Sequence, residues 1–128
     1  SQESVLTEAA QKKLQAIYEK IATSQPVTWA VAALPEDELP VVITIHEFAK
    51  RMQHMAGSRA DSPAPLPLQA TINANHPLAQ KLLRGKKEEK QMKLAQQAYS
   101  LALLAQDLLQ GNALSDFLQN SVEVMVEE

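Results

Sequence analysis

The apolar positions follow a helical period at the start of the chain and a strand period in its middle. Within residues 4–24 they are spaced four, four, three and four apart, which predicts an amphipathic helix built on Leu6, Ala10, Leu14, Ile17 and Ile21. Pro26 prevents this helix from continuing. Residues 27–34 and 39–45 are rich in β-branched residues, and residues 68–73 alternate apolar and polar side chains, which predicts three strands.

The turn between the first two predicted strands is short and polar. It consists of residues 35–38, with the sequence PEDE. Two strands joined by so few residues are typical of an antiparallel hairpin, which we therefore predict. Pro40 at the start of the second strand is compatible with an edge position.

Four further helices and one long loop follow these strands. Residues 46–57 predict a helix that ends at Gly57, and the three prolines of residues 57–67 predict an exposed, mobile loop. The next helix has Asn75 as its predicted cap and Pro77 in its first turn, and it ends at Gly85. A long helix is predicted over residues 86–110, closed by Gly111 and Asn112, and a last helix is predicted with Ser115 as its cap. The expected fold class is α+β, with a small three-stranded sheet packed against helices.

The last two predicted helices carry more apolar surface than a lone domain of this size needs. Between Leu94 and Leu109, 11 of 16 residues are Leu, Ala or Tyr, so this helix is apolar on nearly all sides. One stripe runs along the long helix and another along the last helix: Leu94, Ala98, Leu101, Ala105 and Leu108, then Leu114, Phe117, Leu118, Val122 and Met125. We expect these residues to form a homodimer interface, a four-helix bundle of two helices from each protomer. The alternative is a core helix buried within its own protomer.

The predicted helix at residues 46–57 has an unusual apolar stripe. Its large apolar residues are Phe48, Met52 and Met55, which fall within an arc of about 60° on an ideal helix. Methionine is flexible and polarizable, and it is common on surfaces that bind differently shaped apolar partners. The stripe therefore indicates either a binding surface or ordinary packing beneath the proline-rich loop.

Composition and charge limit the number of domains and the kinds of partner that we expect for this chain. A chain of 128 residues with 45% hydrophobic residues predicts one folded domain over residues 1–128. Because the chain begins inside a polar helical pattern and lacks an initiator Met, we expect it to be a fragment of a longer protein. A net charge of −3 gives no general attraction to nucleic acid or to anionic membranes, so neither is an expected partner. No apolar run is long enough to predict a membrane span.

Catalytic and metal-binding patterns are weak. The chain has no cysteine, which excludes disulfides, thiolate zinc sites and a cysteine nucleophile. His46, Glu47 and His54 lack the spacing of a zinc-binding helix, because the two imidazoles are about 80° apart around the helix axis. The basic run at residues 84–93 is interpreted as the solvent-exposed start of a helix and not as a nucleic-acid-binding patch. We expect no catalytic residue, no metal and no cofactor in this chain.

Three segments resemble parts of a known protein family, and one of them is the predicted helix at residues 46–57, which aligns with the family's short Met-bearing helix. In residues 71–85, Ile72, Asn73, His76, Pro77 and Leu78 match the strand–Asn–turn–His-Pro–helix signature of the C-terminal domain of the ninety-kilodalton heat-shock chaperones, which include the bacterial HtpG type. Further matches lie in the long helix and at the start of the last one: Ala102, Leu103, Leu104, Leu114 and Asp116. The resemblance runs from about Val5 to Met125.

The resemblance implies a function for this chain in protein folding and the stress response. The matching domain holds the cytoplasmic chaperone together as a homodimer through its last two helices. The family's Met-bearing helix contacts unfolded or partly folded clients, which here would be the role of Phe48, Met52 and Met55. ATP and Mg bind to a domain that has no counterpart in this sequence, so this chain is not expected to be an enzyme.

The sequence departs from the family at its end. The proline that often follows the Leu-x-Asp start of the last helix is replaced by Phe117, and the ending VEVMVEE differs from the Met-Glu-Glu-Val-Asp tail of eukaryotic cytosolic members. A bacterial origin is therefore favoured. Two alternative hypotheses stay open. The first is a monomeric adaptor that binds a peptide with residues 57–67 and the Met-bearing helix. The second is an enzyme domain that uses His46 or His76.

Overall fold

The computed structural model describes residues 3–57 and 66–127, and it confirms the α+β class. The order of elements is α1 (Glu8–Glu19), β1 (Val27–Ala32), β2 (Val41–Ile45), α2 (Glu47–Gly57), β3 (Leu68–Asn73), α3 (Pro77–Arg84), α4 (Glu88–Ala105) and α5 (Gly111–Val126). Most of the predicted loop at residues 57–67 lies outside the described residues, as do the side chains of Phe48 and Gln53.

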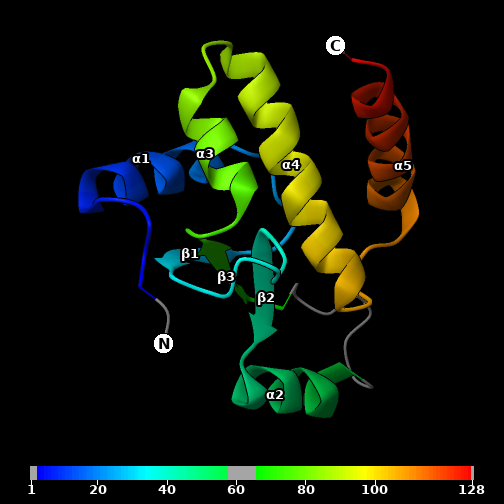
Figure 1. The fold of residues 1–128 in the computed structure, drawn as a ribbon. Helices are drawn as coiled ribbons and strands as arrows, with labels where there is room; N and C mark the ends of the chain where they lie inside the picture. The colour runs from blue at the N-terminus through cyan, green and yellow to red at the C-terminus, as the bar shows by residue number, and fades with distance from the viewer. Residues whose placement is uncertain (1–2, 58–65, 128) are drawn as a thin grey trace.

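The pairing of the strands differs from the predicted hairpin. The sheet order is β1-β3-β2, with β3 parallel to β1 and antiparallel to β2 (Figure 1). The prediction was wrong because alternation identifies strands but does not identify their partners. Of the three strands, β3 has the most fully buried side chains, so it takes the centre, and Leu68, Ala70 and Ile72 pack into the core.

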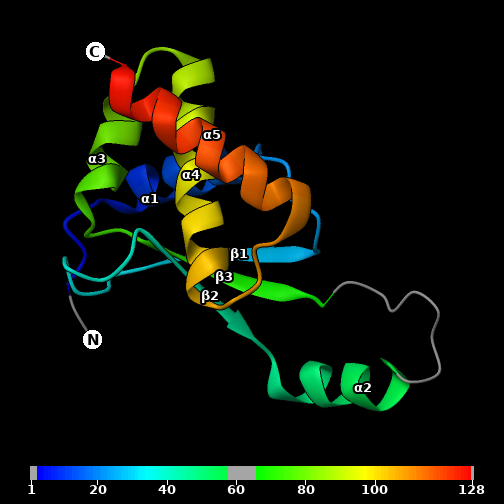
Figure 2. The ribbon, with the colours of Figure 1, turned by 90° about the vertical axis from the view of Figure 1, so that its right-hand side faces the viewer.

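Three helices cover one side of the sheet. Figures 1 and 2 show α1, α3 and α4 above the strands, whereas α2 lies on the opposite side, away from these helices. The core between sheet and helices is closed by Leu14, Ile43, Leu82 and Ala95, all at most 1% exposed. Burying such side chains is the main favourable contribution to folding.

Three aromatic residues pack together at the edge of this core. The Trp29 ring on β1 lies between Tyr18 of α1 and Tyr99 of α4, with ring centroids 5.4 and 5.6 Å apart. The Tyr99 hydroxyl donates a hydrogen bond to Gln25 Oε1 at 3.2 Å, and burial raises the pKa of Tyr99 to about 12. The trio therefore ties the first strand to two helices with both apolar contact and a satisfied polar end.

The end of α4 was predicted incorrectly. The helix ends at Ala105 instead of continuing to residue 110, and Asp107 adopts a left-handed conformation with φ 62°. The Leu108 amide donates to the Leu103 carbonyl at 2.9 Å, and the Asp107 amide donates to the Leu104 carbonyl at 3.0 Å. This is the Schellman arrangement, here with Asp in the position that glycine usually takes.

Three predicted caps were also wrong. Gly111, expected to close the long helix, is the first residue of α5 and has φ 63°, and Ser115 lies inside α5, where its hydroxyl donates to the Gly111 carbonyl at 3.4 Å. The cap of α3 is His76 instead of Asn75. Gly85 ends α3 as predicted.

Candidate interaction surfaces

The residues that carry the family resemblance build a hydrogen-bonded junction at the end of β3. Asn73 is 1% exposed, and its Nδ2 donates to the Pro35 carbonyl at 2.8 Å and the Leu39 carbonyl at 3.4 Å. Its Oδ1 accepts from the amides of Leu34 at 3.3 Å and Asn75 at 3.0 Å. One side chain thus fixes the connection between β1 and β2 against the central strand, in place of the hairpin turn that we predicted.

The neighbouring polar residues extend this junction. The Asn75 side chain accepts from the Val5 amide and donates to the carbonyls of Glu3 and Leu34, so it anchors the segment before α1. His76 Nδ1 accepts from the Leu78 amide at 3.0 Å and so caps α3, while Pro77 occupies the first helical position. These contacts give each polar residue of the signature a structural role.

Helices α4 and α5 pack along each other and leave an apolar outer surface. Ala95, Ala98, Tyr99, Ala102 and Leu103 of α4 are buried inside the protomer. Polar contacts also join α4 to α5 and its C-cap. Gln97 hydrogen-bonds with Ser121, and Lys93 Nζ lies 3.8 Å from Glu123 Oε1 and 2.9 Å from Glu127 Oε1. Among the residues that the structure describes, none in α5 is buried.

The predicted interface residues divide into three groups. Ala98 faces the protomer core, while Leu94, Leu108, Leu114 and Phe117 are half-buried against that core. The rest lie on the outside, including Ala105. Among these the exposed fractions are 36% for Leu101, 56% for Leu118, 60% for Val122 and 79% for Met125. The core-helix alternative therefore accounts for the inner face of α4 but not for the outer face of α5.

Sequence reasoning missed one residue of this outer surface. Leu104 is 41% exposed and lies one helical turn after Leu101. Leu104 was not assigned to the predicted stripe through Leu94 and Ala98, because apolar residues surround α4 and periodicity does not separate its faces. We define the outer apolar surface as Leu101, Leu104, Leu118, Val122 and Met125. In Figure 2, α5 lies in front of α4.

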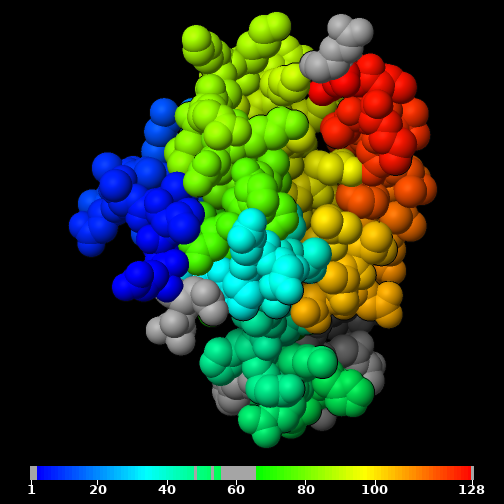
Figure 3. Space-filling model, viewed as in Figure 1, coloured from blue at the N-terminus to red at the C-terminus, as the bar shows by residue number. Residues whose placement is uncertain are grey.

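Helix α2 forms a second exposed apolar site. Met52 is 51% exposed and Met55 is 70% exposed, while the side chain of Phe48 lies outside the described residues. Figures 2 and 3 show α2 projecting from the body of the protein, below the sheet. Two methionines at this spacing on a projecting helix are accessible to a partner.

The candidate catalytic and metal-binding groups do not converge. His46, Glu47 and His54 are exposed on or beside α2, and His76 serves as the cap of α3. Within residues 3–57 and 66–127 no group of three or more His, Asp or Glu side chains is arranged to hold a metal ion. In the same part of the chain, no helix is both long and apolar enough to cross a membrane.

The comparisons with known proteins do not assign this chain to a family. No protein-family model matches the chain, and no curated protein matches it.

Proposed function

We propose that this chain is the C-terminal homodimerisation and client-contact domain of an HtpG-like, ATP-dependent chaperone of the ninety-kilodalton heat-shock family. The resemblance of residues 71–85 and 98–117 to that family motivates the proposal. A cytoplasmic location and a role in protein folding belong to the same proposal.

The outer apolar surface is the observation that carries the proposal. Five large apolar side chains, all at least 36% exposed, lie on two adjacent helices near the end of the chain. Isolated exposed apolar residues are ordinary, but a contiguous set is typical of an interface. Full burial of one such side chain contributes about 1.5–3 kcal/mol, and a two-fold axis would bury each of them twice.

A second copy of the same surface is the partner that fits best. Its exposed apolar side chains are aliphatic or Met, without a charged residue among them, so two copies can pack without burying unpaired charge. Two helices from each protomer would then form a four-helix bundle. The bundle would hold distant ATPase domains at a high effective concentration, which is how such a joint would act in the whole chaperone.

Helix α2 supplies the client contact in this proposal. Met52 and Met55 project from the body on a helix whose opposite side carries Lys50 and His54. Flexible thioethers can adapt to the varied apolar segments of unfolded proteins. The adaptor hypothesis uses the same helix but requires a monomer and a single preferred peptide, so the state of assembly separates the two.

Substitution of the outer apolar surface tests the proposal. We expect the double variant Leu118→Asp with Val122→Asp to be monomeric, because the dimer would bury four carboxylates without partners. Since both side chains are more than half exposed, the variant should retain its circular dichroism spectrum. Size-exclusion chromatography with light scattering measures the mass.

A matched control separates interface loss from a general effect of added acid. Val5 is 65% exposed, precedes α1 and hydrogen-bonds through its amide to Asn75, outside the outer apolar surface, so Val5→Asp should remain dimeric. A folded double variant that stays dimeric at micromolar concentration would refute the interface, and a monomeric unsubstituted chain would favour the adaptor.

A further inference from the structure

Half of the basic residues of this chain are concentrated in one short segment. Six of its twelve Lys and Arg lie within residues 81–93, although the chain as a whole has a net charge of −3. The segment comprises the end of α3, the turn at Gly85 and the start of α4. The positive charge is therefore a local feature of one corner of the fold.

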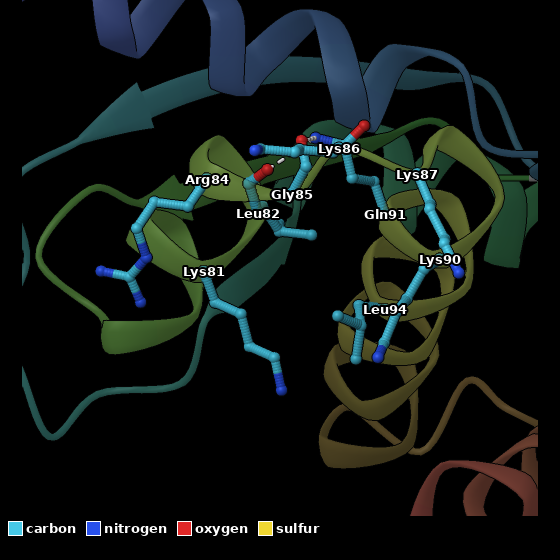
Figure 4. Close-up of a pocket in the computed structure, with 9 residues that line it drawn as sticks. All are labelled: Lys81, Leu82, Arg84, Gly85, Lys86, Lys87, Lys90, Gln91 and Leu94. Carbon is cyan, nitrogen blue, oxygen red and sulfur yellow. Dashed lines mark hydrogen bonds between the residues drawn. The ribbon is translucent and has the colours of Figure 1, made fainter. Parts of the chain in front are cut away.

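A pocket opens at this corner between α3 and α4. It measures about 280 Å³, and Leu82 and Leu94 supply apolar surface at its base. Among the described residues that line it, none is acidic and five are basic: Lys81, Arg84, Lys86, Lys87 and Lys90. Figure 4 shows Lys81 and Lys90 reaching from the two facing helices toward the space beside Leu94, while Arg84 turns away from it.

The turn that closes the pocket is fixed by hydrogen bonds. Gln91 Nε2 donates to the Leu82 carbonyl at 2.6 Å and to the Gly85 carbonyl at 3.1 Å. A Cβ atom at Gly85 would lie 2.9 Å from Gln91 Cγ, so a larger residue at this position would force the Gln91 side chain to shift. The pocket is thus shaped by its own turn before any ligand arrives.

Three ion pairs near the pocket involve lysines that do not line it. Glu88 turns toward Lys20 of the α1 end, at 3.3 Å, and Glu123 and Glu127 pair with Lys93, at 3.8 and 2.9 Å. Across the described residues, Arg84, Lys86 and Lys87 form no ion pair. Basic side chains around an apolar base favour a ligand that combines negative charge with an apolar group.

We propose that this pocket binds an acidic peptide segment of a partner protein, with one apolar side chain in the pocket and flanking carboxylates on the basic rim. The pocket is slightly smaller than the roughly 300–1,000 Å³ of small-molecule sites, which suits one apolar side chain. None of the described residues that line it is aromatic, so it offers no stacking surface to a nucleic-acid base.

A carboxylate of the chain itself already lies beside this basic segment. Glu127, directly after α5, lines a neighbouring hollow together with Lys87, Lys90 and Lys93. The hydrogen bond from Lys93 lowers the pKa of Glu127, and the charges of Lys90 and Lys81 act in the same direction. The proposal does not depend on the chaperone function, because it involves a different surface.

Fluorescence polarisation with a labelled peptide, one leucine flanked on each side by glutamates, tests the proposal on the full 128-residue chain. Lys81→Glu with Lys87→Glu should weaken binding about tenfold or more, since two attractive contacts become repulsive. Lys12→Glu with Lys13→Glu on α1 makes the same change in net charge outside the pocket and should leave binding within about twofold. Thermal melting establishes that each variant is folded.

Control peptides test both halves of the recognition. Replacing the leucine by serine should weaken binding by removing the apolar anchor, and replacing the glutamates by glutamines should abolish it. Equal weakening by both lysine pairs, or equal binding of the serine peptide, would overturn the proposal. Tighter binding of a single-stranded oligonucleotide at the same residues would also overturn it, in favour of nucleic acid.

A measurement on the unsubstituted chain covers the case in which the variants do not fold. In a titration with the leucine peptide followed by amide chemical shifts, the largest changes should fall within residues 81–94. Changes centred on α2, or no binding at all, would contradict the proposal.

Discussion

His76 shows how one residue of the signature couples local structure to pH. Its Nδ1 accepts the hydrogen bond from the Leu78 amide that caps α3, which an imidazole protonated at Nδ1 cannot do. Burial lowers the pKa of His76 below its ordinary value of 6.5, and the charge of Glu36 opposes this shift. The folded state therefore favours the neutral imidazole.

This pKa shift predicts a pH-dependent loss of stability. The unfolded chain binds the proton more readily, so the contribution of His76 is present above about pH 6.5 and is lost as pH falls through the lowered pKa of the folded state. His76→Asn keeps a good capping residue without the titration. Urea unfolding between pH 8 and 5 should show a steeper loss of unfolding free energy in the unsubstituted protein than in His76→Asn. Parallel profiles would mean that the cap is not coupled to protonation.

Asn73 explains at the same scale why the first two strands do not form a hairpin. Its amide satisfies carbonyls at Pro35 and Leu39 and also the Leu34 amide, so the connecting segment is held by a side chain from β3 instead of by strand pairing. No pattern within residues 27–45 carries this information, because the residue responsible lies far along the sequence.

At the scale of elements, the sequence predicted where most helices and strands lie but not how they end or pair. Apolar periodicity identified the three strands and the core-facing side of α1, with Leu14 and Ile17. The end of α4 was missed because Asp107, and not a glycine, adopts the left-handed conformation. Local composition cannot readily predict such a choice, since it depends on how Leu108 and Leu109 pack after the turn.

The candidate surfaces were predicted in part. The exposed residues of α5 follow directly from its spacing of Leu118, Val122 and Met125. On α4 the apolar residues surround the helix, so periodicity could not separate the side that faces its own core from the side that faces outward. The burial of Ala98 and the exposure of Leu104 became clear only from the packing.

Helix α2 carries its own prediction. Met52→Glu with Met55→Glu should weaken binding of a permanently unfolded, reduced and carboxymethylated protein about fivefold or more, because two exposed apolar contacts are replaced by charges. The protein should remain folded and its assembly unchanged, since both side chains are at least half exposed. Surface plasmon resonance against the immobilised client measures the affinity.

The matched control places acid on the opposite side of the same helix. Lys50→Glu with His54→Glu alters exposed residues away from the methionines, and it should reduce client binding much less. Equal loss in both double variants would mean that net charge governs binding. Unchanged affinity in the methionine variant would remove α2 from the client surface.

At the scale of the whole molecule, the three surfaces lie on different parts of the fold. The outer apolar surface lies on α4 and α5, the methionines lie on α2 on the opposite side of the sheet, and the basic pocket lies at the turn between α3 and α4 (Figures 1 and 4). This separation allows dimerisation, client contact and peptide binding to be tested independently. Assembly is the property on which the proposed function depends.

Sedimentation equilibrium of the unsubstituted chain, from low to high micromolar concentration, tests that property most directly. The account predicts a mass near twice 14.1 kDa that persists on dilution, because burial of the outer apolar surface against its own copy would give a stable joint. A mass of one protomer at every concentration would contradict it. The exposed leucines and Met125 would then need another partner. The hypothesis of a monomeric, peptide-binding adaptor would replace that of the chaperone domain.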